Sequence, residues 1–401
     1  MERIFIVAAK RTPIGSFNGS LASLSGVELG AHAMTAVVEQ AGIEPAHIDE
    51  VIVGNVLTGG VGMGPGRQAA IKAGVPDTVP AYTLNMICGS GMKAIMDGAS
   101  HIRAGDANLV LTSGMESMSN AAFVTSGQIR RGVRMGHQMQ EDSIIKDGLT
   151  DAFHHYHMGV TAENVATQCN ISREAQDEFA LNSQQKAVNA IKKGHFAVEI
   201  SPITVTERKR QFEVKDDEYP KANATLEGLQ ALRPAFDKQG SVTAGNASGI
   251  NDGASAILLA SESAVKQHNL TPLAELVEYG QGALAPEIMG LGPVSAVANT
   301  LKKAKMTIED IDVFELNEAF AAQALGVIQG LSEAHHVDEN WLLERSNLSG
   351  GAIALGHPIG ASGNRIVTTL VYQLQRTEKD YGLASLCIGG GMGTALILKR
   401  C

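Results

Sequence analysis

The feature that most constrains the fold of this chain is an order of apolar strands and helices that occurs at both ends. In the first 120 residues, the strand-like runs IFIVAA, DEVIVGNVL, AYTLNMI and NLVLTSGME alternate with helical stretches that end at Gly42, Gly74 and Gly105. From about Thr271 the order resumes, with SNLSGGAIALGHPIGASG corresponding to AYTLNMICGSGMKAI and ASLCIGGGMGTALIL corresponding to NLVLTSGMES. This alternation predicts a mostly parallel sheet with helices on both faces. The long-period similarity predicts two similar α/β halves, with a site between them at the strand ends.

The middle of the chain has a different character. It is richer in charge and Gln, and it contains the amphipathic stretch SREAQDEFALNSQQKAVNAIKKG, with Ser172 as a predicted cap and Gly194 as a stop. We therefore expect residues 1–118 and 250–270 to form an N-terminal half, residues 119–249 an inserted loop domain, and residues 271–401 a C-terminal half.

Composition excludes several classes of protein. A net charge of −10 gives no global basic field for nucleic acid. No run approaches the roughly 18 apolar residues of a membrane span. The opening MERIFIVAAK is too short in its apolar part for a signal peptide, so we expect a cytoplasmic protein; a transit peptide removed beforehand stays an alternative.

The four cysteines are too few and too scattered for a disulfide framework or a zinc site. For Cys169 and Cys401 we expect buried, inert thiols. Cys88 differs, because it follows an apolar strand at the predicted start of a helix, where the helix dipole favours a thiolate. The alternative for Cys88 is a structural thiol beside a Gly-rich turn.

A second loop, GGAIALGHPIGASG, places His357 at a corresponding strand-to-helix turn. A His beside a Cys is a common way to activate a nucleophile. The alternatives are a His that satisfies a turn carbonyl, and a phosphate-binding loop, whose usual spacings this sequence does not fit.

Two further loops carry polar groups. In CIGGGMG, Cys387 ends a strand and could exchange protons, while free N–H groups near Gly389 could form an oxyanion hole. In NEAF, Asn317 could orient a water or an oxyanion, although an Asn before a helix is usually a cap.

Taken together, the segments NMICGSGMKAI, NEAFAAQA, GGAIALGHPIGASG and CIGGGMG resemble the thiolase family in order and interval. MERIFIVAAKRTPIGSF, YHMGVTAENVA and TAGNASGINDGA extend the resemblance over nearly the whole chain. It implies two duplicated βαβαβαββ halves in five layers, α-β-α-β-α, with an inserted loop domain.

The resemblance also implies roles. Cys88 would be the acylated nucleophile, His357 its base, and Cys387 the acid–base for the methyl proton. Asn317 would hold a water that joins His357 in one oxyanion hole, and the N–H groups of Cys88 and Gly389 would form the other. The implied reaction is the reversible, ping-pong condensation of two acetyl-CoA into acetoacetyl-CoA and CoA, with no metal and no covalently bound cofactor.

The family binds CoA against the loop domain, and YHMG resembles its short-chain, biosynthetic branch. Met158, Met289 and Phe320 would narrow the acyl pocket, unless the Met residues only fill the core. The positions that match CoA- or substrate-lining residues are Ser248, His157, Met158, Leu149, Phe236, Phe320, Met289 and Ala319. Arg208 to Arg210 or Lys221 could meet the 3′-phosphate.

The arm from Gln128 to Gln140 resembles the family's tetramerisation loop, so we expect a homotetramer. Residues 333–346, which include Trp341 and the pair His335-His336, depart from the family; we interpret them as a surface connection and not a metal site.

Three alternatives to an acetyl-CoA acetyltransferase remain open. They are a broader-range 3-ketoacyl-CoA thiolase of fatty-acid degradation, a β-ketoacyl synthase, and a non-catalytic acyl-CoA-binding protein. Cys387 and the inserted segment argue against a synthase, and the presence of all three of Cys88, His357 and Cys387 argues against a non-catalytic protein.

Overall fold

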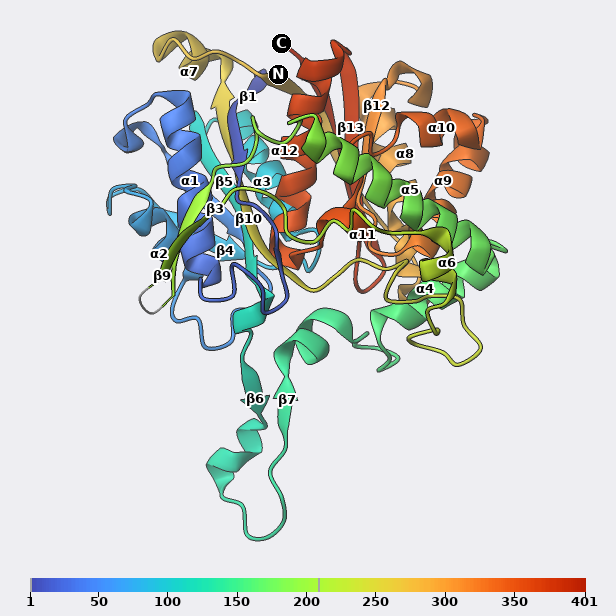
Figure 1. The fold of residues 1–401 in the computed structure, drawn as a ribbon. Helices are drawn as coiled ribbons and strands as arrows, with labels where there is room; N and C mark the ends of the chain where they lie inside the picture. The colour runs from blue at the N-terminus through green and yellow to red at the C-terminus, as the bar shows by residue number, and fades with distance from the viewer. Residues whose placement is uncertain (1, 208–209) are drawn as a thin grey trace.

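The computed structural model describes residues 2–207 and 210–401. Its first half contains the predicted alternation of strands and helices (Figure 1). These elements are β1 (Ile4–Arg11), β2 (Gly15–Ser16), α1 (Gly26–Ala41), η1 (Pro45–His47), β3 (Glu50–Gly54), α2 (Pro65–Lys72), β4 (Ala81–Leu84), α3 (Ser90–Ala104), β5 (Leu109–Ser117), η2 (Met118–Asn120), β10 (Asn251–Ser261) and α7 (Glu262–Gln267).

The second half follows the same order with one difference. Its elements are β11 (Ala274–Ala283), η5 (Pro286–Leu291), α8 (Gly292–Ala304), η6 (Ile308–Asp310), β12 (Val313–Leu316), α9 (Ala321–His335), α10 (Glu339–Arg345), α11 (Ala352–Leu355), α12 (Ile359–Thr377), β13 (Tyr381–Ile388) and β14 (Met392–Arg400). The counterpart of β4 is reduced to an isolated parallel bridge between Ser346 and Phe314 of β12. The second half therefore repeats the order of the first, but its counterpart of β4 is shorter.

One sheet runs through both halves, in the order β12-β13-β14-β11-β1-β10-β5-β3-β4. The halves join where β1 pairs with β11, at Phe5 with Glu275 and Ile6 with Ala274. The expectation of a mostly parallel sheet is wrong: only β3·β4, β3·β5 and β12·β13 are parallel among these described pairs, whereas β1, β10, β11 and β14 pair antiparallel. The last strand of each half runs antiparallel to the parallel strands before it. The prediction failed because the apolar pattern of a buried strand does not indicate the direction of the strand.

The two halves of this continuous sheet form the two β layers of the fold class, and helices cover both of them. Helix α1 packs on β10, β5 and β1, and α8 packs on β11 and β14. Helices α3 and α12 lie side by side in the middle, where α12 touches strands of both halves (Figure 1). These two central helices follow two of the four loops that the sequence singled out, those of Cys88 and His357.

Local sequence explains the ends of these helices. Ser25 and Glu28 form a reciprocal capping box at the start of α1, and Gly42 ends it in the left-handed conformation, with φ of 66°. Ser172 caps the helix α5 (Arg173–Lys192), as predicted. Among the described residues, no helix is both long enough and apolar enough to cross a membrane.

Residues 119–249 pack on both halves. The hairpin of β8 (Ile203–Glu207) and β9 (Arg210–Val214) lies against the core around α1, while α5 lies against α11 and α9. The helices α4 (Met158–Gln168) and α6 (Leu226–Gln230) lie beside the second half (Figure 1).

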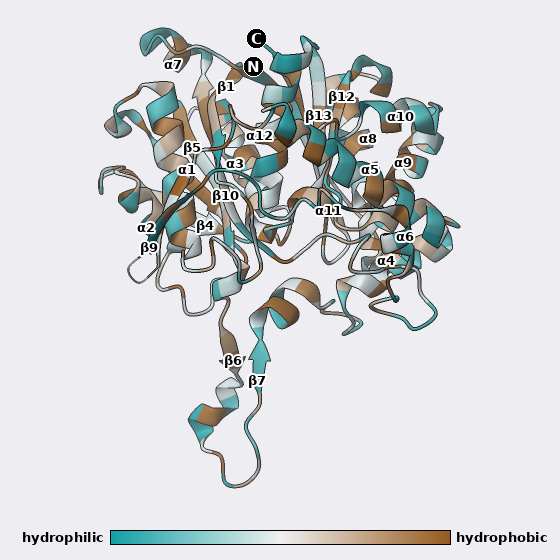
Figure 2. Cartoon of the chain, in the orientation of Figure 1, coloured by the Kyte–Doolittle hydropathy of each residue, from teal (hydrophilic) through white to brown (hydrophobic). Residues whose placement is uncertain are grey.

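Residues 123–142 form an arm that projects from the body. It consists of β6 (Phe123–Thr125), η3 (Gly127–Arg131) and β7 (Gln140–Asp142), and it returns through the π-helix η4 (Ile144–Leu149) (Figure 1). Hydrophobic residues are visible on it in Figure 2. Phe123, Met135 and Met139 are 64%, 95% and 75% exposed, which is unusual for such side chains.

Candidate active site

The Cys88 loop connects β4 to α3 through a constrained turn. Ile87 has a φ of 48°, which is strained for a β-branched residue. Two contacts hold it there: Asn85 Oδ1 accepts from the Ile87 N–H at 2.9 Å, and Ser90 Oγ donates to the Ile87 carbonyl at 2.7 Å. The turn presents Cys88 just before the first residue of α3.

Glycines bring the Cys88 loop against the His357 loop. A Cβ on Gly91 would lie 2.7 Å from the Asn364 nitrogen and 3.0 Å from the Gly360 carbonyl oxygen. Gly360 and Gly363 in turn lie against β5 and Met92 with no space for a side chain. The first turns of α3 and α12 therefore touch backbone to backbone, which places the two loops side by side.

His357 is buried, and its hydrogen bonds define its tautomer. Nδ1 lies 2.6 Å from Ser362 Oγ, which itself donates to the Pro358 carbonyl at 3.0 Å. The Ser362 proton is thereby used, so Nδ1 carries the imidazole proton and Nε2 has a free lone pair. Nε2 is buried and has no hydrogen-bond partner among the described residues. Burial, aided by Arg365, lowers the pKa of His357 to about 4, so the ring is a neutral base.

Asn317 and Cys387 are also buried, each 1% exposed. Both polar atoms of the Asn317 amide are without a partner in the described part of the chain. Asn317 does not cap a helix, because α9 begins at Ala321 with Phe320 as its cap residue. Burial raises the pKa of Cys387, and the nearby Cys88 thiol raises it further.

The environment of the Cys88 sulfur differs from the expectation. Burial raises the pKa of Cys88 to about 11, against the lowering influence of the backbone N–H groups of Gly389 and Cys88 itself. The expected lowering of the pKa by a helix N-terminus is therefore wrong for this resting structure, because desolvation outweighs it. The same two N–H groups face the sulfur, where an oxyanion would form.

Five of the predicted substrate-lining residues share one apolar cluster with Cys387: Met158, Phe236, Met289, Ala319 and Phe320. His157 stacks on Phe236 with ring centroids 4.6 Å apart. The Ser248 N–H donates to the Ala319 carbonyl at 2.9 Å, and Leu149 packs in the cluster that contains Cys88. Five of the eight residues thus share a cluster with Cys387, Leu149 shares one with Cys88, and His157 and Ser248 contact members of the Cys387 cluster.

A cavity of about 480 Å³ opens beside this cluster. Ile87, Met158 and Gly389 line it, together with Lys146, Asp147 and Phe153 among others. A thioester that entered here would reach the Cys88 turn.

Other predicted residues lie elsewhere. Arg208 falls outside the described residues, Arg210 stacks over Phe212 in the β8–β9 hairpin, and Lys221 stacks over Tyr219. Cys169 is half-buried, but Cys401 is exposed, so its predicted burial is wrong: it lies just after the last strand, β14, and outside the buried part of the sheet.

The prediction of a surface connection at 333–346 is also incomplete. Part of it folds into α10, which buries Leu342 completely and packs Trp341 edge-on against Phe314. No group of metal-binding side chains was found among the described residues.

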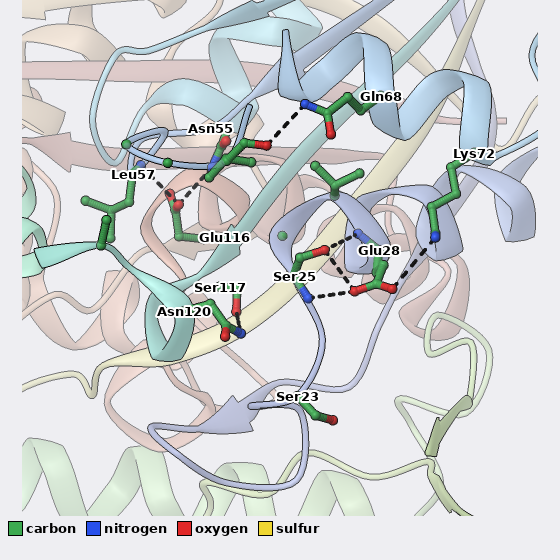
Figure 3. A pocket seen from close by; sticks show the side chains of 16 residues that line it. Ser23, Ser25, Glu28, Asn55, Leu57, Gln68, Lys72, Glu116, Ser117 and Asn120 are labelled. Carbon is green, nitrogen blue, oxygen red and sulfur yellow. Dashed lines mark hydrogen bonds and ion pairs between the residues drawn. The ribbon is translucent and has the colours of Figure 1, made fainter. Parts of the chain in front are cut away.

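Among the buried carboxylates that sequence reasoning missed, two lie against the glycines of the His357 loop. Glu116 accepts hydrogen bonds from Asn55, Val56, Leu57 and Gly360, and Figure 3 shows the first and third of these contacts beside a cavity of about 640 Å³.

The second missed carboxylate is Glu318, which accepts from Ser183 and Asn347. Glu116 lies at the end of the apolar run that ends in MES, and Glu318 lies just after the run FEL. A Glu at the end of an apolar strand was the sequence signal that could have indicated these buried carboxylates.

Comparison with known proteins decides the family. Residues 4–263 match the family described as thiolase, N-terminal domain, and residues 270–400 match thiolase, C-terminal domain. The chain belongs to the thiolase family. This thiolase is 51% identical over 400 residues to an acetyl-CoA acetyltransferase of Escherichia coli K12, with 100% of both chains covered.

Solved structures agree on the fold. The acetyl-CoA acetyltransferase of Bacillus anthracis is 42% identical with a TM-score of 0.95, covering 100% of this chain and 99% of that one. Human mitochondrial 3-ketoacyl-CoA thiolase is also 42% identical, with a TM-score of 0.94 and the same coverage. The fold alone therefore does not separate these two activities.

Proposed function

We propose that this thiolase is an acetyl-CoA C-acetyltransferase, which condenses two acetyl-CoA into acetoacetyl-CoA and CoA and also runs the reverse cleavage. The observation that carries the proposal is a pair of buried, unpartnered polar groups: His357 Nε2, on the loop that meets the Cys88 loop, and the Asn317 amide, whose residue is bonded through its backbone to Ser385, two residues before Cys387. Unpaired buried polar atoms cost about 1–3 kcal/mol each, so their retention points to a ligand that they bind. The acetyltransferase names of full-length relatives at about half identity support the substrate.

In the first half-reaction, Cys88 attacks the thioester carbonyl while its proton moves to His357 Nε2. With a neutral imidazole and a protonated thiol at rest, the transfer occurs as the carbonyl is attacked. The N–H groups of Cys88 and Gly389 would stabilise the tetrahedral oxyanion, each donor being worth about 3 kcal/mol. Cys387 then gives its proton to the departing CoA thiolate, which leaves acetyl-Cys88 and a Cys387 thiolate.

In the second half-reaction, the Cys387 thiolate takes the α-proton of the second acetyl-CoA. The enolate oxygen would be held by protonated His357 and by a water on Asn317. The carbanion attacks acetyl-Cys88, and the Cys88 thiolate that is expelled recovers its proton from His357. Every proton is returned, as ping-pong turnover requires.

The acyl end of the site favours a short substrate. Met158, Met289 and Phe320 pack in one cluster with Cys387, and we infer that their bulk narrows the acyl pocket. The alternative, a 3-ketoacyl-CoA thiolase with a broader range, predicts comparable turnover of longer chains. The ratio of turnover on acetoacetyl-CoA to that on 3-ketooctanoyl-CoA distinguishes them, and a ratio near one would reject the short-chain proposal.

The central claim is tested by CoA-dependent loss of acetoacetyl-CoA absorbance. We expect activity in the wild type and its abolition in Cys88→Ala. An equally active Cys88→Ala would reject Cys88 as nucleophile, and an inactive wild type that still binds acyl-CoA would favour a non-catalytic protein. Cys387→Ala with full rate would reject Cys387 as the α-proton base.

The remaining assignments are proposals of the same kind. We place CoA against residues 119–249, treated as the inserted domain between 1–118 with 250–270 and 271–401. We also propose a homotetramer assembled through the arm, and a cytoplasmic enzyme of acyl-CoA and lipid metabolism. Mass measurement by sedimentation and cell fractionation test the last two.

A further inference from the structure

We propose that Glu116, at the end of β5, is a positioning residue that fixes the Cys88 loop relative to the His357 loop. The inference rests on the proposed function, in which His357 takes the proton of Cys88. Glu116 is 1% exposed, and the mechanism above makes no use of it.

The carboxylate of Glu116 accepts four hydrogen bonds, all from neutral donors. Oε1 accepts from Asn55 Nδ2 at 2.8 Å and from the Leu57 N–H at 3.1 Å. Oε2 accepts from the Val56 N–H and from the Gly360 N–H, both at 3.0 Å. All four donors come from two segments, residues 55–57 and the start of α12.

These two segments are the supports of the two catalytic loops. Val56, Leu57 and Ile359 form one apolar cluster with Ile87 and Cys88 on its edge. Gly360 follows His357 by three residues, and a Cβ there would lie 2.6 Å from Glu116 Oε2. Through its hydrogen bonds, one carboxylate thus connects residues 55–57, which pack against the Cys88 loop, to the first turn of the helix that follows His357.

The setting favours a functional role over a purely stabilising one. Among the described residues, the carboxylate has no cation in contact, and Glu28 and Lys72 lie across the adjoining cavity (Figure 3). Burial raises the pKa of Glu116 to about 7 although its four donors lower it. A buried charge without a counter-ion is costly, and here its negative charge also acts on the Cys88 thiol.

The test is Glu116→Gln. Both carboxylate oxygens accept twice, so the amide NH₂ of Gln would face two N–H donors in either orientation. We expect kcat to fall about 10- to 100-fold while KM for acetoacetyl-CoA stays within about two-fold, because only the reacting groups are displaced. The Glu116 charge raises the pKa of Cys88, so loss of the charge alone would speed alkylation of Cys88 by iodoacetamide. Slower alkylation of the Cys88 peptide, followed by mass spectrometry, is therefore the result expected from displacement of the two loops, and faster alkylation would overturn the proposal.

Asp252→Asn is the matched control. Asp252 is a buried carboxylate on the neighbouring strand β10, and it accepts from the Ser119 N–H and Oγ instead of from the His357 loop. We expect its kcat and its Cys88 alkylation rate to stay within about three-fold of wild type. Equal losses in both variants would overturn the proposal, as would a Glu116→Gln enzyme with wild-type kcat.

Two measures keep the outcome decisive. If Glu116→Gln does not fold, Glu116→Asp keeps the charge but is one methylene too short to hold both segments, and a wild-type kcat in that variant would overturn the proposal. If the wild type has no thiolase activity, the proposed function fails, but the alkylation ratio still decides the role of Glu116.

Discussion

At the scale of single residues, the site depends on groups that the fold leaves without partners. Ser362 holds Nδ1 of His357, whereas Nε2 has no hydrogen-bond partner among the described residues, and neither do the nitrogen and oxygen of the Asn317 amide. A folded chain keeps such groups only at a cost in stability. Under the proposed mechanism, this thiolase gives up part of its stability for a pre-formed place for substrate oxygen.

The lowered pKa of His357 makes stability depend on pH. Its pKa is about 4 in the fold, against 6.5 when it is exposed, so the unfolded chain binds more protons between these values. This contribution is complete above pH 6.5 and is lost as pH falls towards 4, by about 3 kcal/mol in total. Urea unfolding of wild type and His357→Gln from pH 4 to 7 should show a steeper acid loss in wild type. Parallel profiles would contradict the assignment.

Ser362→Ala tests the tautomer lock. Removing Oγ leaves Nδ1 of His357 buried without its partner, so we expect a loss of about 1 kcal/mol in unfolding free energy and about a tenfold lower kcat. Ser113→Ala, which removes a buried hydroxyl bonded to the Ser255 carbonyl at 2.8 Å, is the control and should lower stability only. An unchanged kcat in Ser362→Ala would show that the lock is not needed.

Residue types in loops were enough to single out candidate residues, but not their protonation. Cys88 and His357 were singled out at strand-to-helix turns, and Cys387 and Asn317 at strand ends. The raised pKa of Cys88 was missed, because desolvation depends on the packing of distant segments. Glu116 was missed because a Glu that follows an apolar run looks the same in sequence whether it is buried or solvated.

At the scale of elements, the central pair α3 and α12 sets the geometry of the site. Their first turns approach at glycine positions that leave no space for a Cβ. Strand and helix positions could be predicted from periodicity, cap residues and glycine stops. Strand direction could not, since β10 enters only after residues 119–249, and neither could the folding of α10 around Trp341.

Gly91→Ala tests this contact. Its Cβ would meet backbone atoms of Asn364 and Gly360, so we expect a loss of about 1–3 kcal/mol in unfolding free energy together with lower kcat. Gly98→Ala, on the same helix, would meet side chains of Val110, Leu259 and Thr112 at 3.0–3.1 Å, which can adjust. A larger loss of kcat in Gly98→Ala than in Gly91→Ala would contradict the argument.

At the scale of the whole molecule, the arm is the least explained feature of a lone chain. Its apolar side chains have no cover among the described residues, and a hairpin of two short strands is marginal by itself. Packing against other copies would supply the missing burial.

Met135→Asp with Met139→Asp tests assembly through the arm. Each charge would be placed in the proposed interface, so we expect sedimentation to show a smaller species than the tetramer proposed for the wild type, at equal concentration. Lys146→Ala, at the base of the arm and already ion-paired with Glu141, serves as control. A tetramer that survives both Asp changes would reject the arm as the interface.

The bridge at Ser346 has a consequence for how sheets of different copies can meet. Along the outer side of β12, Asn347 donates to the Phe314 carbonyl from its backbone, and its side chain bonds both the N–H and the carbonyl of Leu316. An amide side chain thus takes the place of a neighbouring strand, so a strand of another chain cannot pair with these backbone groups at this edge of the sheet. The other border of this large sheet is β4. A sheet that can be extended at one border alone joins with one other sheet and then stops, so this architecture protects the enzyme from growing into a fibre.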